Sequence, residues 1–140
     1  MRVAVIDGQG GGFGRSIIES IRKSGIEDIE ILGLGTNALA TAAMLKAGAN
    51  EGATGENAIK CNAGKADVII GSIAILIANS MLGELTSGMA EAIAASDAQK
   101  ILIPLNKNRV YITKVPEEPL PHHIEDAVNK LKSIRSNKNV

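Results

Sequence analysis

Residues 3–14 read Val3-Ala4-Val5-Ile6-Asp7-Gly8-Gln9-Gly10-Gly11-Gly12-Phe13-Gly14. The four apolar residues predict a buried strand, and the five glycines among residues 8–14 predict a sharp turn. Isoleucines at positions 17, 18 and 21 then recur at helical spacing. A buried strand, a glycine-rich turn and a helix in this order are typical of the first unit of a Rossmann-like α/β domain.

The rest of the chain alternates between strand-like and helix-like segments. Apolar runs predict strands at residues 29–34, 68–71 and 100–104, with a vestigial strand inside 49–53. Helical patterns lie between them, and a last amphipathic helix follows Pro119 and Pro121. This alternation predicts a parallel sheet covered by helices, with the second and fourth strands on either side of the first.

The segment 109–115 is rich in β-forming side chains and follows a short turn at Asn106-Lys107-Asn108. We expect it to pair antiparallel with the strand at 100–104. The predicted fold class is therefore a single Rossmann-like three-layer α/β domain over residues 1–135, with a mostly parallel sheet and an antiparallel edge strand. Residues 136–140 are expected to form a frayed polar tail.

Charge and composition argue against several classes of function. Fifteen Lys and Arg residues balance fifteen Asp and Glu residues, and the chain has one Tyr, one Phe and no Trp. Such a chain lacks both the positive charge and the stacking platforms of nucleic-acid-binding proteins. The longest uncharged stretch, 68–83, is shorter than the roughly 20 residues of a membrane span. A single cysteine, Cys61, and a strand-like start without a secretory signal predict a cytoplasmic protein.

The glycine turn is the main candidate for ligand binding. Glycines let the backbone approach a ligand closely, and the N–H groups that open a helix attract anions. Gly8, Gly12 and Gly14 match the spacing Gly-x-x-x-Gly-x-Gly, which resembles the turn of short-chain dehydrogenases, where those glycines face a dinucleotide pyrophosphate. The alternative is a tight structural turn that packs the helix on the sheet. The expected ligand-binding residues of the turn are Asp7, Gly8, Gln9, Gly10, Gly11, Gly12, Phe13 and Gly14.

Two features argue against a complete dehydrogenase. No acidic residue lies at positions 34–37, where an acid for the adenosine ribose is expected. Tyr111 is followed four residues later by Val115, so the Tyr-x-x-x-Lys pair of short-chain dehydrogenases is missing. The cofactor is left open between NAD(P) and another nucleotide. No Cys/His spacing predicts zinc, and no general base stands out, so catalysis is left open as well.

Further polar residues are expected at the rim of the same sheet edge. Thr36 and Asn37 follow the second strand, where Thr36 is suited to capping a helix and Asn37 is the better ligand contact. The loop at 51–57 carries two acids and an amide that either hold a cation or a ribose or remain solvated, with Thr54 capping a short helix. The candidate rim residues are Thr36, Asn37, Glu51, Thr54, Glu56 and Asn57.

The apolar run at 73–82 is large for the core of a small domain, so part of it is expected to stay outside that core. It therefore predicts a homo-oligomer, with a dimer as the expected state. Asn79, Ser80 and Glu84 interrupt or follow this run. Polar groups in such surroundings need partners, at either a subunit interface or a binding site.

Six segments spread over nearly the whole chain carry a family resemblance. They are Val5 to Gly12, Leu34 to Ala38, Lys46 to Asn57, Ala78 to Glu84, Ile103-Pro104 and Pro119 to His122. Together they resemble a family of short bacterial proteins classed as a domain of unknown function. The resemblance implies a cytoplasmic bacterial protein and supplies no reaction. Phe13 departs from the smaller aliphatic residue typical of that position and is expected to crowd the turn.

The turn, its context and the resemblance together predict a domain that binds a nucleotide or another small phosphate-bearing ligand. The alternative is a non-catalytic oligomeric assembly or a regulatory module on a Rossmann scaffold. Neither nucleic acid nor a membrane is expected as a partner.

Overall fold

The computed structural model describes residues 1–105 and 109–137. Five strands form one sheet in the order β3-β2-β1-β4-β5, and every pairing between them is parallel. The predicted placement of the second and fourth strands beside the first is therefore confirmed. The strands are β1 (Arg2–Asp7), β2 (Glu30–Gly35), β3 (Glu51–Thr54), β4 (Val68–Ser72) and β5 (Gln99–Ile103).

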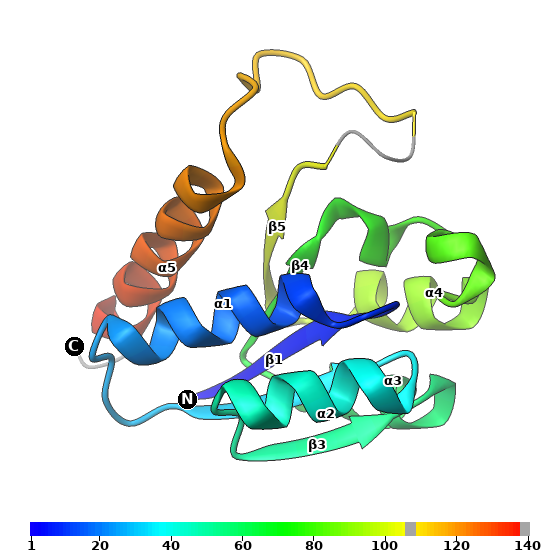
Figure 1. Ribbon diagram of the computed structural model, residues 1–140, viewed down its shortest axis with the longest axis horizontal. Helices are drawn as coiled ribbons and strands as arrows, with labels where there is room; N and C mark the ends of the chain where they lie inside the picture. The colour runs from blue at the N-terminus through cyan, green and yellow to red at the C-terminus, as the bar shows by residue number, and fades with distance from the viewer. Residues whose placement is uncertain (106–108, 138–140) are drawn as a thin grey trace.

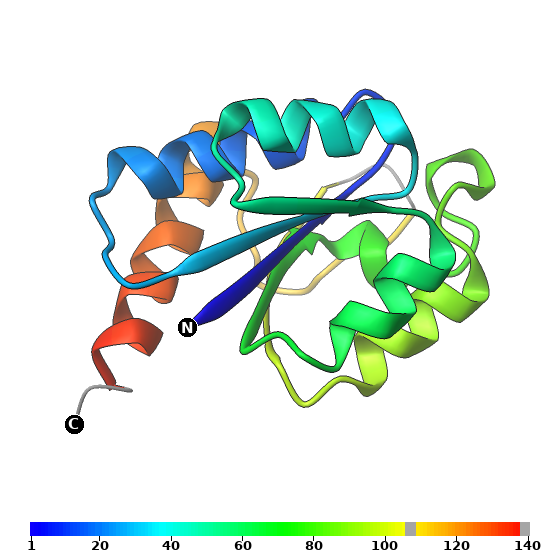
Figure 2. The same cartoon turned by 90° about the horizontal axis from the view of Figure 1, so that it is seen from below.

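Helices cover both faces of this sheet. One face carries α1 (Gly12–Lys23), α2 (Ala38–Ala47) and α5 (Leu120–Asn137), and the other carries α3 (Glu56–Ala63) and α4 (Ser87–Ala95). Figure 2 shows the blue and cyan helices on one side of the strands and the green and yellow-green helices on the other. Because all five strands are parallel, their carboxyl ends lie at one edge of the sheet.

The core is aliphatic and divided by the sheet. In β1, Val3 and Val5 face the cluster beneath α1 and α5, whereas Ala4 and Ile6 face the cluster beneath α3 and α4. All four side chains are fully buried. A central parallel strand covered on both faces needs this continuous apolar run, which is why the sequence predicts it well.

The prediction of an antiparallel edge strand is wrong. All pairings in the described sheet are parallel, and residues 109–119 project away from the sheet without joining it, as the yellow and orange chain of Figure 1 shows. The N–H of Val115 bonds to the carbonyl of Ile112, and Arg109 and Lys114 have φ of 53° and 62°. This turn and these left-handed residues break the extended run that its β-forming side chains suggest. The predicted turn at 106–108 lies outside the described residues.

Capping side chains mark where two of the helices begin. Asn37, and not Thr36, caps α2 by accepting a hydrogen bond from the N–H of Ala40, and Thr86 caps α4.

The run at 73–82 forms two short 3-10 turns, η1 (Ile73–Leu76) and η2 (Met81–Gly83). The helix α5 extends to Asn137, and the end of the predicted tail, 138–140, lies outside the described residues. None of the described helices has the length and apolar character needed to cross a membrane.

Candidate functional site

The glycine turn leaves β1 and enters α1 within a few residues. The N–H of Gly11 bonds to the carbonyl of Gly8 at 3.0 Å, and Gly11 takes a left-handed φ of 76° as the residue before α1. Such a conformation favours glycine because a Cβ would clash with the backbone. Gly11 has no side chain to cap this end of α1, and Asp7 takes up the N–H of Gly14, so the N–H of Gly12 remains available to an anion.

The glycines of the turn differ in what surrounds them. A Cβ on Gly11 would lie 2.7 Å from the Cα of Ala40, and one on Gly14 would lie 2.7 Å from the Sδ of Met44. These two glycines let α1 pack closely against its neighbours. In contrast, a Cβ on Gly10 or Gly12 would meet no atom within 4 Å. Packing therefore accounts for only part of the glycine cluster.

Asp7 holds the turn from inside. Its carboxylate accepts hydrogen bonds from the N–H groups of Gly8 at 2.8 Å and Gly14 at 2.7 Å. Burial raises the pKa of this carboxyl above its ordinary value, and the two N–H groups oppose that shift. The nearby charge of Glu84 raises the pKa further. The residue that ends β1 is thus a buried acid at the floor of the site.

Glu84 joins the glycine turn to the end of β2. Its Oε1 accepts hydrogen bonds from the N–H of Gln9 at 2.9 Å, the hydroxyl of Thr36 at 2.7 Å and the amide of Asn37 at 2.7 Å. These hydrogen bonds lower the pKa of Glu84, and the bond from the N–H of Gln9 is the largest cause. Glu84 is therefore a charged anion at neutral pH, held between the ends of two strands.

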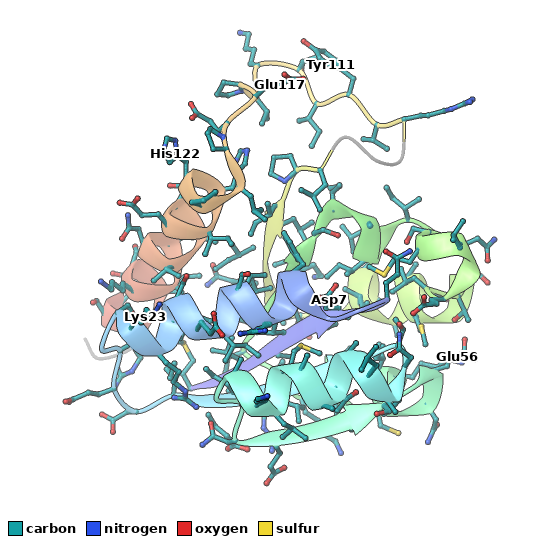
Figure 3. The ribbon with its side chains drawn as sticks, viewed as in Figure 1. Asp7, Lys23, Glu56, Tyr111, Glu117 and His122 are labelled. Atoms are coloured by element: carbon teal, nitrogen blue, oxygen red, sulfur yellow. The ribbon has the colours of Figure 1, made fainter. Side chains whose placement is uncertain are left out.

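A pocket of about 270 Å³ opens on the other side of the turn. It lies between the ends of β1 and β4, where the strand order reverses and where ligands bind in open parallel sheets. Figure 3 places Asp7 at this end of β1. Most of the lining is apolar, and it consists of Asp7, Gly8, Gln9, Phe13, Ser72, Ala74, Met81, Leu82 and Leu105.

The predicted rim residues do not all reach this pocket. Thr36 and Asn37 lie beside the turn through their bonds to Glu84, and the amide of Asn37 also bonds to the carbonyl of Gln9 at 2.9 Å. The hydroxyl of Thr54 instead pairs with that of Thr41 on α2 at 2.8 Å.

The acids of the 51–57 loop lie elsewhere. Glu51 begins β3 opposite Leu32, in the middle of β2, and is exposed. Glu56 opens α3 and accepts a hydrogen bond from the hydroxyl of Thr86, and Asn57 faces Cys61 on its own helix. None of these side chains lines the pocket beside Asp7.

Sequence reasoning left six contributors out of the expected site. They come from the end of β4 and from the segments after β4 and β5, and they are Ser72, Ala74, Met81, Leu82, Glu84 and Leu105. The only early signal was the polar interruption at Glu84, whose need for a partner is met by the turn. Larger hollows lie near α5, where Figure 3 shows His122, Tyr111 and Glu117, and one of them shares Leu105 with the pocket beside Asp7.

Comparison with known proteins places the chain in a family. The family model described as Domain of unknown function (DUF3842) matches residues 2–136, so the chain belongs to this family. No curated protein matches the chain.

Solved structures show where the fold recurs. The chain is similar to a dodecameric FMN-dependent Ubix-like decarboxylase from Escherichia coli O157:H7, with a TM-score of 0.58 and 11% identity over 94% of this chain and 95% of that chain. A saccharopine dehydrogenase (L-Glu forming) from Saccharomyces cerevisiae matches with a TM-score of 0.44 and 16% identity, over 90% of this chain and 24% of that chain. The first likeness supports a Rossmann-like α/β fold that recurs over nearly the whole length of another protein.

Proposed function

We propose that this protein binds a small phosphate-bearing ligand, such as a nucleotide, at the pocket beside the glycine turn. The observation that carries this proposal is the openness of Gly10 and Gly12, where a side chain would meet nothing. In the described chain their N–H groups form no hydrogen bond, and Gly12 opens α1 while Gly10 lies two residues before it. Such N–H groups are the usual partners of a phosphate.

The charges around the pocket support one position for the proposed phosphate. Among the described residues of the lining Asp7 alone is charged, and a phosphate beside its carboxylate would be repelled. The open glycines lie at the exposed rim, away from that floor. We therefore place the phosphate over Gly10 and Gly12, and a planar apolar group in the pocket against Phe13 and Leu105.

The experiment is a thermal-shift panel with FMN, ADP, ATP, NAD, NADP and inorganic phosphate. FMN enters as a probe because the Ubix-like decarboxylase of similar fold depends on it. A ligand at a hundredfold excess over its Kd stabilises the folded state by about 2.7 kcal/mol. Gly12→Val places two methyl groups over the rim without touching the core, so it should abolish the shift while the protein stays folded.

The matched control is Gly64→Val, because Gly64 is also exposed, has an ordinary φ of −78° and has open space around it, at the far end of α3. This variant should keep the ligand shift of the parent. No shift with any probe in the parent would refute the proposal, as would a Gly12→Val variant that binds as well as Gly64→Val.

A homo-oligomer is our second proposal. The domain absorbs most of the apolar run at 73–82, yet Leu82 is 98% exposed and Tyr111 is 83% exposed. Large apolar side chains at such positions favour contact with another subunit. The Ubix-like decarboxylase of similar fold is a dodecamer. We expect light scattering at micromolar concentration to report a dimer or a larger assembly, and a monomer mass at every concentration would reject the proposal.

A further inference from the structure

We infer that Glu84 is a specificity-determining residue that admits mononucleotides to this site and excludes dinucleotides. A mononucleotide here means one planar ring system joined to one sugar and its phosphate. This inference rests on the proposed function. It concerns how much of a Rossmann-type ligand the site can accept, and it follows from two independent features of the structure.

The first feature is the place that Glu84 occupies. Dinucleotide-binding Rossmann folds hold the adenosine ribose at the end of the second strand, through an acid that belongs to that strand. Here the end of β2 carries Thr36 and Asn37, and both give their hydrogen bonds to the carboxylate of Glu84. The loop after β4 thus fills with its own side chain the place where the second half of a dinucleotide would lie.

Glu84 also takes a donor that a second phosphate would need. The N–H of Gln9 in the glycine turn bonds to Glu84 at 2.9 Å. A phosphate that approached this group would lose the hydrogen bond and meet a like charge. Beyond this point the turn offers only Gly10 and Gly12, on the side of the open rim.

The second feature is the extent of the pocket. Its lining comes from α1, from η2 and from residues at or after the ends of β1, β4 and β5, and it includes neither Thr36 nor Asn37, which follow β2. Its volume of about 270 Å³ is just below the roughly 300–1,000 Å³ of small-molecule sites. The structure therefore offers one lobe of a two-lobed site, and the other lobe is closed.

The loop that carries Glu84 is fixed, so the closure is part of the fold. The N–H of Asn79 bonds to the carbonyl of Leu85 at 2.8 Å. The hydroxyl of buried Ser80 bonds to the carbonyl of Ala74 at 2.6 Å. These bonds close the loop at its base and hold Glu84 over the turn.

The test compares the affinities of FMN and AMP with those of FAD and NAD, by calorimetry, for the parent and Glu84→Ala. We expect the parent to bind a mononucleotide at least about tenfold more tightly than either dinucleotide, a difference of roughly 1.4 kcal/mol. In Glu84→Ala the ratio of dinucleotide to mononucleotide affinity should rise by at least about tenfold. Glu84→Gln, which keeps an acceptor and removes the charge, should give a smaller rise and serves if the alanine variant does not fold.

The control is Glu91→Ala, which removes an exposed acid of α4 far from the turn and should leave the ratio unchanged. A parent that binds FAD or NAD as tightly as FMN or AMP would overturn this inference and leave the proposed function standing. An unchanged ratio in Glu84→Ala and Glu84→Gln would overturn it too. Absence of binding by every probe to every folded variant would instead reject the proposed function, and the inference with it.

Discussion

The carboxylate of Asp7 accepts a hydrogen bond at 2.7 Å from the N–H of Gly14, so the last residue of β1 holds the first turn of α1. Its other oxygen accepts the N–H of Gly8. One buried acid thereby supplies both ends of the glycine turn with acceptors. The turn keeps its shape through this side chain, while the N–H groups at its tip stay available.

We predict that Asp7→Ala destabilises the protein. Two buried N–H groups lose their acceptor, and each such loss costs about 1–3 kcal/mol. Because burial already raises the pKa of Asp7, removing the charge offsets part of this cost, and a net loss of about 2 kcal/mol is expected in urea unfolding at pH 7. Glu91→Gln, an exposed acid on α4, is the control. Equal stability of the two variants would contradict the role of Asp7.

The two neighbouring glycines Gly11 and Gly12 should respond differently to alanine. At Gly11 the φ of 76° is strained for alanine, and the new Cβ would lie 2.7 Å from the Cα of Ala40, so we expect a loss of about 3 kcal/mol. At Gly12 the new Cβ meets nothing and the residue is helical, so the change should stay within about 0.5 kcal/mol. Denaturant unfolding of both variants measures the difference. Similar losses would mean that Gly12 also serves packing.

The β1–turn–α1 unit could be predicted because its signals are local. A four-residue apolar run, a glycine cluster and isoleucines at helical spacing lie within 20 residues or so, and each has one physical interpretation. The alternation of strands and helices predicted a parallel sheet, and the preferred placement of the second and fourth strands beside the first agrees with the order observed. That residues 109–115 form no strand could not be predicted in the same way. The left-handed φ of Lys114 and the turn to Val115 override the β propensity of the side chains, and no local sequence signal announces them.

The candidate site was predicted only where it lies close in sequence to the turn. Glu84 contacts Gln9 across 75 positions, and no local pattern specifies such a contact. Conversely, the 51–57 loop was expected at the rim because it carries two acids and an amide that could hold a cation or a ribose. The strand β3 is only four residues long, and α3 begins at once with Glu56, whose carboxylate is directed to Thr86.

The contribution of Glu84 to stability should depend on pH. Its pKa in the folded protein lies below the ordinary value of 4.5, so the folded state favours the charged carboxylate. Its stabilising effect is therefore complete above the pKa of the unfolded chain and is lost as the pH falls through the lower pKa of the folded state. We expect the parent to exceed Glu84→Gln in stability at pH 7, and the difference to shrink below pH 4.5.

Urea unfolding of both proteins between pH 3 and 7 follows this change. A difference that stays constant over the whole range would show that the hydrogen bonds to Glu84 do not depend on its charge.

The backbone at Leu82 predicts a stabilising substitution. Leu82 has a φ of 56° and a side chain that is 98% exposed, so the monomer gains little burial from the leucine and bears the cost of the left-handed conformation. Asparagine tolerates this conformation better, and Leu82→Asn should raise the free energy of unfolding by up to about 1 kcal/mol.

Leu39→Asn is the matched control, because Leu39 is 67% exposed but lies in the helix α2, where asparagine is less favourable than leucine. Unfolding should be measured at a concentration where light scattering reports monomers, since subunit contacts through Leu82 would reverse the sign. A loss in monomeric Leu82→Asn as large as that in Leu39→Asn would show that the loop gains from the leucine within a single chain.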